Sequence, residues 1–91
     1  MAAPLLSRAQ VDAELARLAA SAAFARSPRH VRFLTHLAHA TLSGDTGRLR
    51  EMAVGVDVFY RSQSRFDPRR DSIVRAEARR LRQKLARFEA G

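Results

Sequence analysis

The stretch that decides the fold is DSIVRAEARRLRQKLARF, which runs from Asp71 to Phe88. Its apolar side chains recur every three or four residues, so they share one face of an α-helix. Asp71 or Ser72 is suited to cap the start of that helix. We therefore predict an amphipathic helix over residues 71–89 with a core-facing stripe made of Val74, Ala78, Leu81, Leu85 and Phe88.

The opposite face of this helix is rich in hydrogen-bond donors and positive charge. Arginine and glutamine reach the base edges of double-stranded DNA in the major groove, which admits one helix. A polar segment before the helix ends in Phe66-Asp67-Pro68 and is predicted to be a loop, where further arginines would clamp phosphates. The candidate DNA-binding residues are Arg61, Arg65, Arg69 and Arg70 in the loop, and Ser72, Arg75, Arg79, Arg82 and Gln83 on the helix. Glu77, near the apolar stripe, is expected to offset one arginine, with Arg80 three residues on.

Charge is distributed unevenly along the 91 residues, whose formal net charge is +8. Residues 1–60 carry seven basic and five acidic side chains, whereas residues 61–91 carry ten basic and four acidic ones. This asymmetry indicates a polyanionic partner that faces the last third of the chain. A chain of this length forms one domain, and the lack of cysteine excludes disulfides and thiolate metal sites.

Three more helices are expected upstream, over residues 8–25, 28–43 and 48–60. Together with the last helix they predict an all-α, compact four-helix domain. The end signals are Ser7 with Gln10 for the first helix, and Ser27-Pro28 and Gly44 for the second. The apolar face expected on the second helix consists of Val31, Leu34, Leu37, Ala38 and Thr41.

The third of these segments has two interpretations. Residues 52–60 are rich in β-branched and aromatic side chains, and on propensity alone they would form a strand. We favour a helix because the three-to-four spacing already begins at Leu49. Gly55 inside this helix is expected to allow the close approach of another helix. Phe59, Tyr60 and Phe66 are expected to anchor the core and the loop, with base stacking by Tyr60 as the lesser alternative.

The last helix resembles the recognition helix of winged-helix output domains in two-component response regulators. The resemblance rests on residues 71–85 and their ending Leu81-Arg82-Gln83-Lys84-Leu85. It implies a helix-turn-helix in which residues 49–60 form the positioning helix. In that family a β-hairpin wing follows the recognition helix. The sequence ends at Gly91, so we expect neither wing contacts nor control by phosphorylation to carry over.

A second resemblance covers residues 24–88. Its pattern includes Arg32-Phe33-Leu34, Val54-Gly55-Val56-Asp57-Val58-Phe59, Phe66-Asp67-Pro68 and Asp71-Ser72-Ile73-Val74-Arg75. This is similar to the helical DNA-binding-type module found ahead of tetratricopeptide or cyclase regions in large bacterial signalling proteins. Tyr60 departs from that pattern, because it stands where the family usually has a glycine.

Other functional classes are weaker. The second helix contains His30, His36 and His39. His36 and His39 point away from its predicted apolar face and are interpreted as surface residues, with no metal or other cofactor expected. No nucleophile–base arrangement or phosphate loop supports catalysis, so we expect no enzyme. No apolar run approaches the length of a membrane span, and the N-terminus does not read as a signal peptide, which favours a cytoplasmic, nucleoid-associated protein without a membrane partner.

The leading hypothesis is therefore a small bacterial transcriptional regulator that binds double-stranded DNA in a sequence-specific manner. The alternatives are a non-specific nucleoid or nucleic-acid binder and a protein-interaction module whose last helix pairs with a partner. A homodimer through the alanine-rich first helix is also expected, because one helix has a small footprint on DNA. A separate regulatory protein partner remains open.

Overall fold

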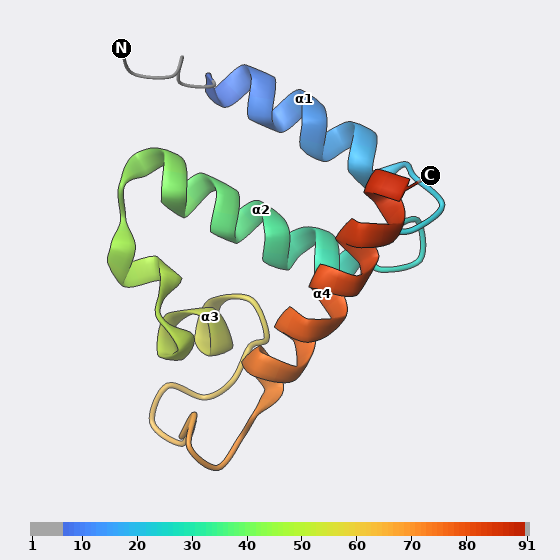
Figure 1. Ribbon diagram of the computed structural model, residues 1–91. Helices are drawn as coiled ribbons and strands as arrows, with labels where there is room; N and C mark the ends of the chain where they lie inside the picture. The colour runs from blue at the N-terminus through green and yellow to red at the C-terminus, as the bar shows by residue number, and fades with distance from the viewer. Residues whose placement is uncertain (1–6, 91) are drawn as a thin grey trace.

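The computed structural model describes residues 7–90, and within that range the fold is entirely helical, as predicted. The elements are α1 (Arg8–Ala19), α2 (Pro28–Ser43), a short 3-10 helix η1 (Thr46–Leu49), α3 (Glu51–Asp57) and α4 (Ile73–Ala90). In Figure 1, α1 and α2 run side by side in opposite directions, α3 lies beyond α2, and α4 crosses the end where α2 begins.

Helix α1 begins as predicted but ends earlier. The Ser7 hydroxyl accepts a hydrogen bond from the backbone of Gln10, and the Gln10 side chain accepts one from the backbone of Ser7. The expected extension to residue 25 is wrong. Ser21 Oγ donates to the Leu18 carbonyl at 2.6 Å, which competes with continuation of the helix. The chain then turns, and Phe24 enters the core with 1% of its surface exposed.

Helix α2 has the predicted bounds, but it buries more than the predicted apolar face. Gly44 ends the helix in the left-handed conformation (φ 70°), as expected. The fully buried residues of α2 are His30, Phe33, His36 and Ala40, whereas Val31, Leu34 and Leu37 of the predicted apolar face are half-buried against the core. The reason is that two sides of α2 are covered. The predicted face lies toward α1, and the side that carries His30 and His36 lies toward α4 and η1.

The third predicted helix, residues 48–60, is divided in two. The Asp45 side chain accepts from the backbone of Arg48 and starts η1, and α3 follows but ends at Asp57. The strand alternative for this segment is wrong. Val58 and Phe59 are buried beyond the helix end, so their β-branched and aromatic character serves packing rather than a strand.

The close approach at Gly55 involves a loop rather than a second helix. A Cβ at this position would overlap the Phe66 ring, which packs directly against the glycine. Phe66 lies in the connection of residues 58–72 and has 7% of its surface exposed. The ring therefore fastens the middle of that connection onto α3. The prediction of Phe59 and Phe66 as anchors is confirmed, but Tyr60 is 72% exposed.

The core gathers apolar side chains from every helical segment except η1. In α4 the predicted stripe is confirmed: Val74 and Leu81 are buried, and its other members are half-buried against them. The start of α4 is capped by Asp71, whose Oδ1 accepts from the backbone N–H of Ile73 at 3.0 Å. The buried apolar residues of the core are Leu18, Phe24, Phe33, Val54, Val58, Phe59, Phe66, Val74 and Leu81.

Candidate nucleic-acid interface

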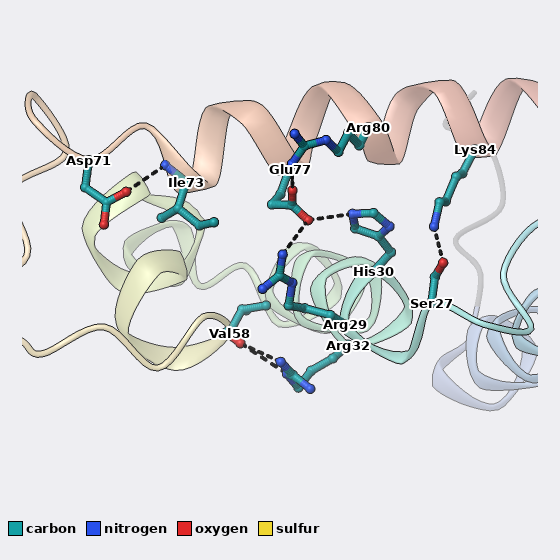
Figure 2. Close-up of polar contacts among 10 residues, drawn as sticks. All are labelled: Ser27, Arg29, His30, Arg32, Val58, Asp71, Ile73, Glu77, Arg80 and Lys84. Carbon is teal, nitrogen blue, oxygen red and sulfur yellow. Dashed lines mark hydrogen bonds and ion pairs between the residues drawn. The ribbon is translucent and has the colours of Figure 1, made fainter.

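A buried ion cluster fixes the orientation of α4 on α2 (Figure 2). Glu77, on the inner side of α4, is only 2% exposed. Its carboxylate accepts hydrogen bonds from Arg29 Nη2 at 3.1 Å and His30 Nε2 at 2.8 Å, and it also pairs with Arg80. The predicted pairing with Arg80 is thus confirmed, but the two contacts from α2 were not foreseen. They lock the rotation of α4 about its own axis.

The pKa of Glu77 lies below the ordinary glutamate value of 4.5. Burial alone would raise it, because burial disfavours the charged form. The hydrogen bonds from Arg80, Arg29 and His30 act in the opposite direction and together outweigh burial. Glu77 is therefore ionised at neutral pH, and it holds α2 and α4 together as a charged acceptor.

A second polar contact fastens the C-terminal half of α4. Lys84 Nζ donates to the hydroxyl of Ser27, at the start of α2 (Figure 2). This contact explains why Ser27 precedes α2 without capping it through its side chain. With Glu77 and Lys84 both directed inward, the side of α4 opposite the core is left to solvent.

The exposed side of α4 carries the predicted reading residues. Arg79, Arg82 and Gln83 are all exposed, and none forms a hydrogen bond or ion pair with another residue in the described range. Their guanidinium and amide groups are therefore accessible to an external acceptor. Three donors within one and a half turns of a fixed helix have the spacing to follow a groove.

The two predicted site residues at the start of α4 serve the fold as well. Arg75 donates to the carbonyl of Pro68 at 2.8 Å, and its Nε lies 3.6 Å from a carboxylate oxygen of Glu51. It therefore ties α4 to both the loop and α3, although its side chain remains 58% exposed. Ser72 is exposed, and its carbonyl accepts the first backbone bond of α4 from Ala76.

The loop arginines are exposed but largely paired with aspartates. Arg61 Nε lies 2.9 Å from Asp71, and both Arg69 and Arg70 contact Asp67, at 3.3 Å and 3.9 Å. Hydrogen bonds from the backbone and side chain of Arg69 hold the pKa of Asp67 below its ordinary value. Arg65 is exposed and makes no side-chain ion pair within residues 7–90.

These arginines surround an open depression at the start of α4. Arg61, Arg65 and Arg70 line it together with Phe66, Asp67 and Asp71, and its volume is about 600 Å³. The aspartates offset part of the positive charge of the loop arginines at close range. They also hold two of the guanidinium groups in defined positions, with their remaining N–H donors free.

All three histidines of α2 have structural contacts, although His36 and His39 were expected to be surface residues. His30 and His36 are buried, and His36 Nε2 donates to the backbone carbonyl of Arg48 at 2.7 Å. His39 Nε2 lies 2.6 Å from Asp12 and joins α2 to α1. Each histidine reaches a different segment, so no pair of them shares a site. Within residues 7–90, no group of three potential ligand side chains is placed to hold a metal ion.

A second exposed feature lies just beyond the end of α3, at Tyr60, which was expected mainly to anchor the core or the loop. Tyr60 has φ 57°, and the guanidinium carbon of Arg32 lies 4.8 Å from the centre of its ring. The alternation of apolar residues up to Phe59 concealed this change from core to solvent. The only signal was the departure from the second family resemblance, whose pattern has a glycine where this sequence has Tyr60. Glycine is the usual residue at positive φ.

No helix in the described part of the chain combines the length and hydropathy that crossing a bilayer requires. Comparisons of the whole chain with protein-family models, with curated proteins and with solved structures found no match.

Proposed function

We propose that this protein binds double-stranded DNA in a sequence-specific manner, with α4 in the major groove. The observation that carries the proposal is the division of α4 into two faces. The inner face is fixed by Val74, Leu81 and the buried carboxylate of Glu77. The outer face presents Arg79, Arg82 and Gln83 without internal partners in residues 7–90. A rigid helix with free donors meets the geometric demand of base readout.

The loop supplies the phosphate contacts in this proposal. Arg61, Arg69 and Arg70 lie near the start of α4, each beside a carboxylate. In this proposal they contact the DNA phosphates that border the groove occupied by α4. In a helix-turn-helix arrangement, α3 is the positioning helix. Residues 58–72 separate α3 from α4, and this connection is longer than the common helix-turn-helix turn of about three to four residues. The motif that we propose is therefore a helix-turn-helix with a long loop. A role in transcriptional regulation is part of the same proposal.

The experiment that tests the proposal is selection of bound fragments from a random DNA pool, followed by titration at two salt concentrations. We expect one enriched motif, and affinity that falls with salt by about 0.9 log units per phosphate contact per log unit of salt. Arg82→Ala should reduce affinity for the enriched motif more than for random duplex, because a lost base contact costs about 1–3 kcal/mol of discrimination.

Arg48→Ala is the matched control. It removes the same charge from η1, which lies away from α4 in Figure 1, and its side chain is exposed. We expect only the small, salt-dependent loss due to net charge. Strong binding without an enriched motif would favour the non-specific nucleoid binder. Weak binding even at low salt would overturn the proposal and favour a protein-interaction module.

A homodimer is part of the same proposal, supported by the surface between α1 and α2. Val11 and Leu15 of α1 and Leu34 of α2 are incompletely buried and line an apolar groove there. Helix α1 carries two acidic and two basic residues, so the entire net charge of +8 lies outside it. Two copies therefore approach with least repulsion through this face. Such a dimer would read two half-sites about one helical turn apart.

A further inference from the structure

The backbone at Tyr60 adopts a conformation that tyrosine rarely takes. Its φ of 57° is the only positive value at a non-glycine position in the described range. A bulky residue at positive φ is sterically disfavoured. The backbone has a local reason for this shape: the N–H of Arg61 returns to the carbonyl of Gly55 at 3.0 Å and closes the end of α3. That reason accounts for a glycine at position 60, but it does not account for a tyrosine.

The side chain does not repay the cost by burial. Tyr60 is 72% exposed, so it contributes little to the core. A strained residue whose side chain points to solvent is a candidate for function, because strain persists where a contact outside the fold uses it.

The ring is supported from one side by a fixed arginine. Arg32 Nε and Nη2 both donate to the carbonyl of Val58, at 3.1 and 2.9 Å, which holds the guanidinium in place (Figure 2). This guanidinium lies over one face of the Tyr60 ring at 4.8 Å. The arrangement resembles a stack with one layer present, because the exposed remainder of the ring is open to a second planar group.

The charge around the ring selects the kind of planar group. Arg32 lies over the Tyr60 ring itself, and Arg29 lies over the ring of the adjacent Phe59 at 5.5 Å. Aromatic rings bordered by arginines are the elements that bind single-stranded nucleic acid, with the ring stacking on a base and the cations contacting phosphates. A base inside a duplex is already stacked on both faces, so the open face of Tyr60 requires an unpaired base.

We propose that Tyr60 and Arg32 form a stacking site for an unpaired nucleobase of single-stranded DNA, distinct from the duplex-reading face of α4. The site extends the proposed function to DNA that is locally opened or ends in an overhang. It does not depend on α4, since Arg79 and Arg82 take no part in it. The two proposals can therefore fail separately.

The chain offers a direct probe, because Tyr60 is its only tyrosine and it contains no tryptophan. Intrinsic emission of the protein therefore reports on this ring alone. A short oligodeoxythymidine should quench that emission. As a control for light absorbed by the bases, the same amount of free thymidine is added to a small tyrosine amide, and the loss of emission seen there is subtracted. Binding is followed separately with a labelled copy of the same oligodeoxythymidine. If that copy binds while the tyrosine emission stays unchanged, the proposal is overturned.

Two substitutions separate the ring from the backbone. Tyr60→Gly removes the ring and suits the positive φ, so the fold is retained. It should weaken oligodeoxythymidine binding at least about fivefold, the lower range for loss of one stacked base. Tyr60→Phe should retain the parental affinity, because the ring is preserved. Equal affinity of Tyr60→Gly and the parent for the single strand would contradict the proposal.

Blunt duplex DNA serves as the second arm. We expect Tyr60→Gly to leave duplex affinity unchanged and Arg82→Ala to leave single-strand affinity nearly unchanged. If Tyr60→Gly weakens both equally, Tyr60 belongs to the duplex surface and the separate site is refuted. If single-strand binding behaves as expected but no duplex is bound, this inference stands and the role of α4 falls.

Discussion

At the scale of single residues, the contacts of Glu77 decide how α4 is seated. A buried carboxylate is costly unless it is paired and hydrogen-bonded. Here Arg29 and Arg80 keep about half of their own surface in water, so only the acceptor bears the full cost of burial. Because a carboxylate only accepts, His30 Nε2 carries the proton, which leaves Nδ1 buried without a partner among residues 7–90.

Glu77→Gln should lower the free energy of unfolding by about 2 kcal/mol, the usual range for hydrogen bonds to a charged group. The amide retains one acceptor oxygen but loses the charge that Arg29, His30 and Arg80 contact. Urea denaturation at neutral pH measures the change. Glu89→Gln is the matched control, since Glu89 lies on the same helix but is exposed. An equal effect of both substitutions would contradict a specific role for Glu77.

The loss of unfolding free energy caused by Glu77→Gln should depend on pH in a defined direction. The folded-state pKa of Glu77 is lowered from 4.5, so its contribution to stability is fully present above that value. It is lost as the pH falls through the lower, folded-state pKa. The difference in unfolding free energy between the parent and Glu77→Gln should therefore shrink in acid. A difference that grows below the ordinary value would show that the sign is wrong.

At the scale of elements, the junction between α3 and the connection of residues 58–72 depends on one glycine. Phe66 occupies the space that a side chain at position 55 would need, and in doing so it holds the depression lined by the loop arginines. The connection contains no regular helix or strand, so this ring and the aspartate contacts define its path. Its placement beside α4 is thus a matter of packing rather than of local propensity.

Gly55→Ala should destabilise the protein by about 1–3 kcal/mol, because overpacking displaces the Phe66 ring. Helix propensity alone predicts the opposite sign, a gain of about 1 kcal/mol. The two effects separate in a Phe66→Ala background, where Gly55→Ala should become stabilising. Chemical denaturation of the four variants of this cycle measures the reversal. Additive effects would mean that the ring does not contact the glycine.

The two arginine-bearing elements should respond differently to substitution. Arg79→Ala should relax sequence preference, whereas Arg69→Ala should weaken binding to all sequences about equally. Arg79 lies on the outer face of α4, and Arg69 lies in the loop, where Asp67 holds it. Competition binding with cognate and random duplexes distinguishes the outcomes. Equal losses on both duplexes for Arg79→Ala would mean that it contacts phosphate only.

At the scale of the whole molecule, charge and apolar exposure occupy different helices. Helix α4 carries six basic and two acidic residues, whereas α1 is balanced and borders the apolar groove. The positive surface is thus separate from the surface proposed for self-association. Binding of DNA by one face and of a second copy by the other are compatible in a single assembly.

Leu15→Glu should shift the protein from dimer to monomer, because a charge placed in the apolar groove is desolvated on association. Sedimentation velocity across a range of concentrations measures the state. The residue is half-buried at the helix surface, so the fold should tolerate the change. Ala13→Glu, at an exposed position of the same helix outside the groove lining, adds the same single negative charge and is the control. A monomeric parent, both free and on an inverted-repeat DNA, would remove the dimer from the proposal.

The sequence by itself determined the helical class, the bounds of α2 to the residue, and the inner stripe of α4. These features depend on local signals, namely the three-to-four spacing of apolar residues and the capping residues Pro28 and Gly44. Tertiary packing decided what local signals could not. The early end of α1, the division of residues 48–60, and the burial of His30 and His36 follow from neighbours that are distant in sequence.

The same distinction holds for the candidate site. The outer arginines of α4 follow from the helical period, because the face opposite an apolar stripe is exposed. The carboxylates that engage the loop arginines, the ring of Phe66 against Gly55, and the exposure of Tyr60 beside Arg32 require the chain to be folded. Periodicity shows which residues share a face of one element, whereas only the packing of elements determines what each face contacts.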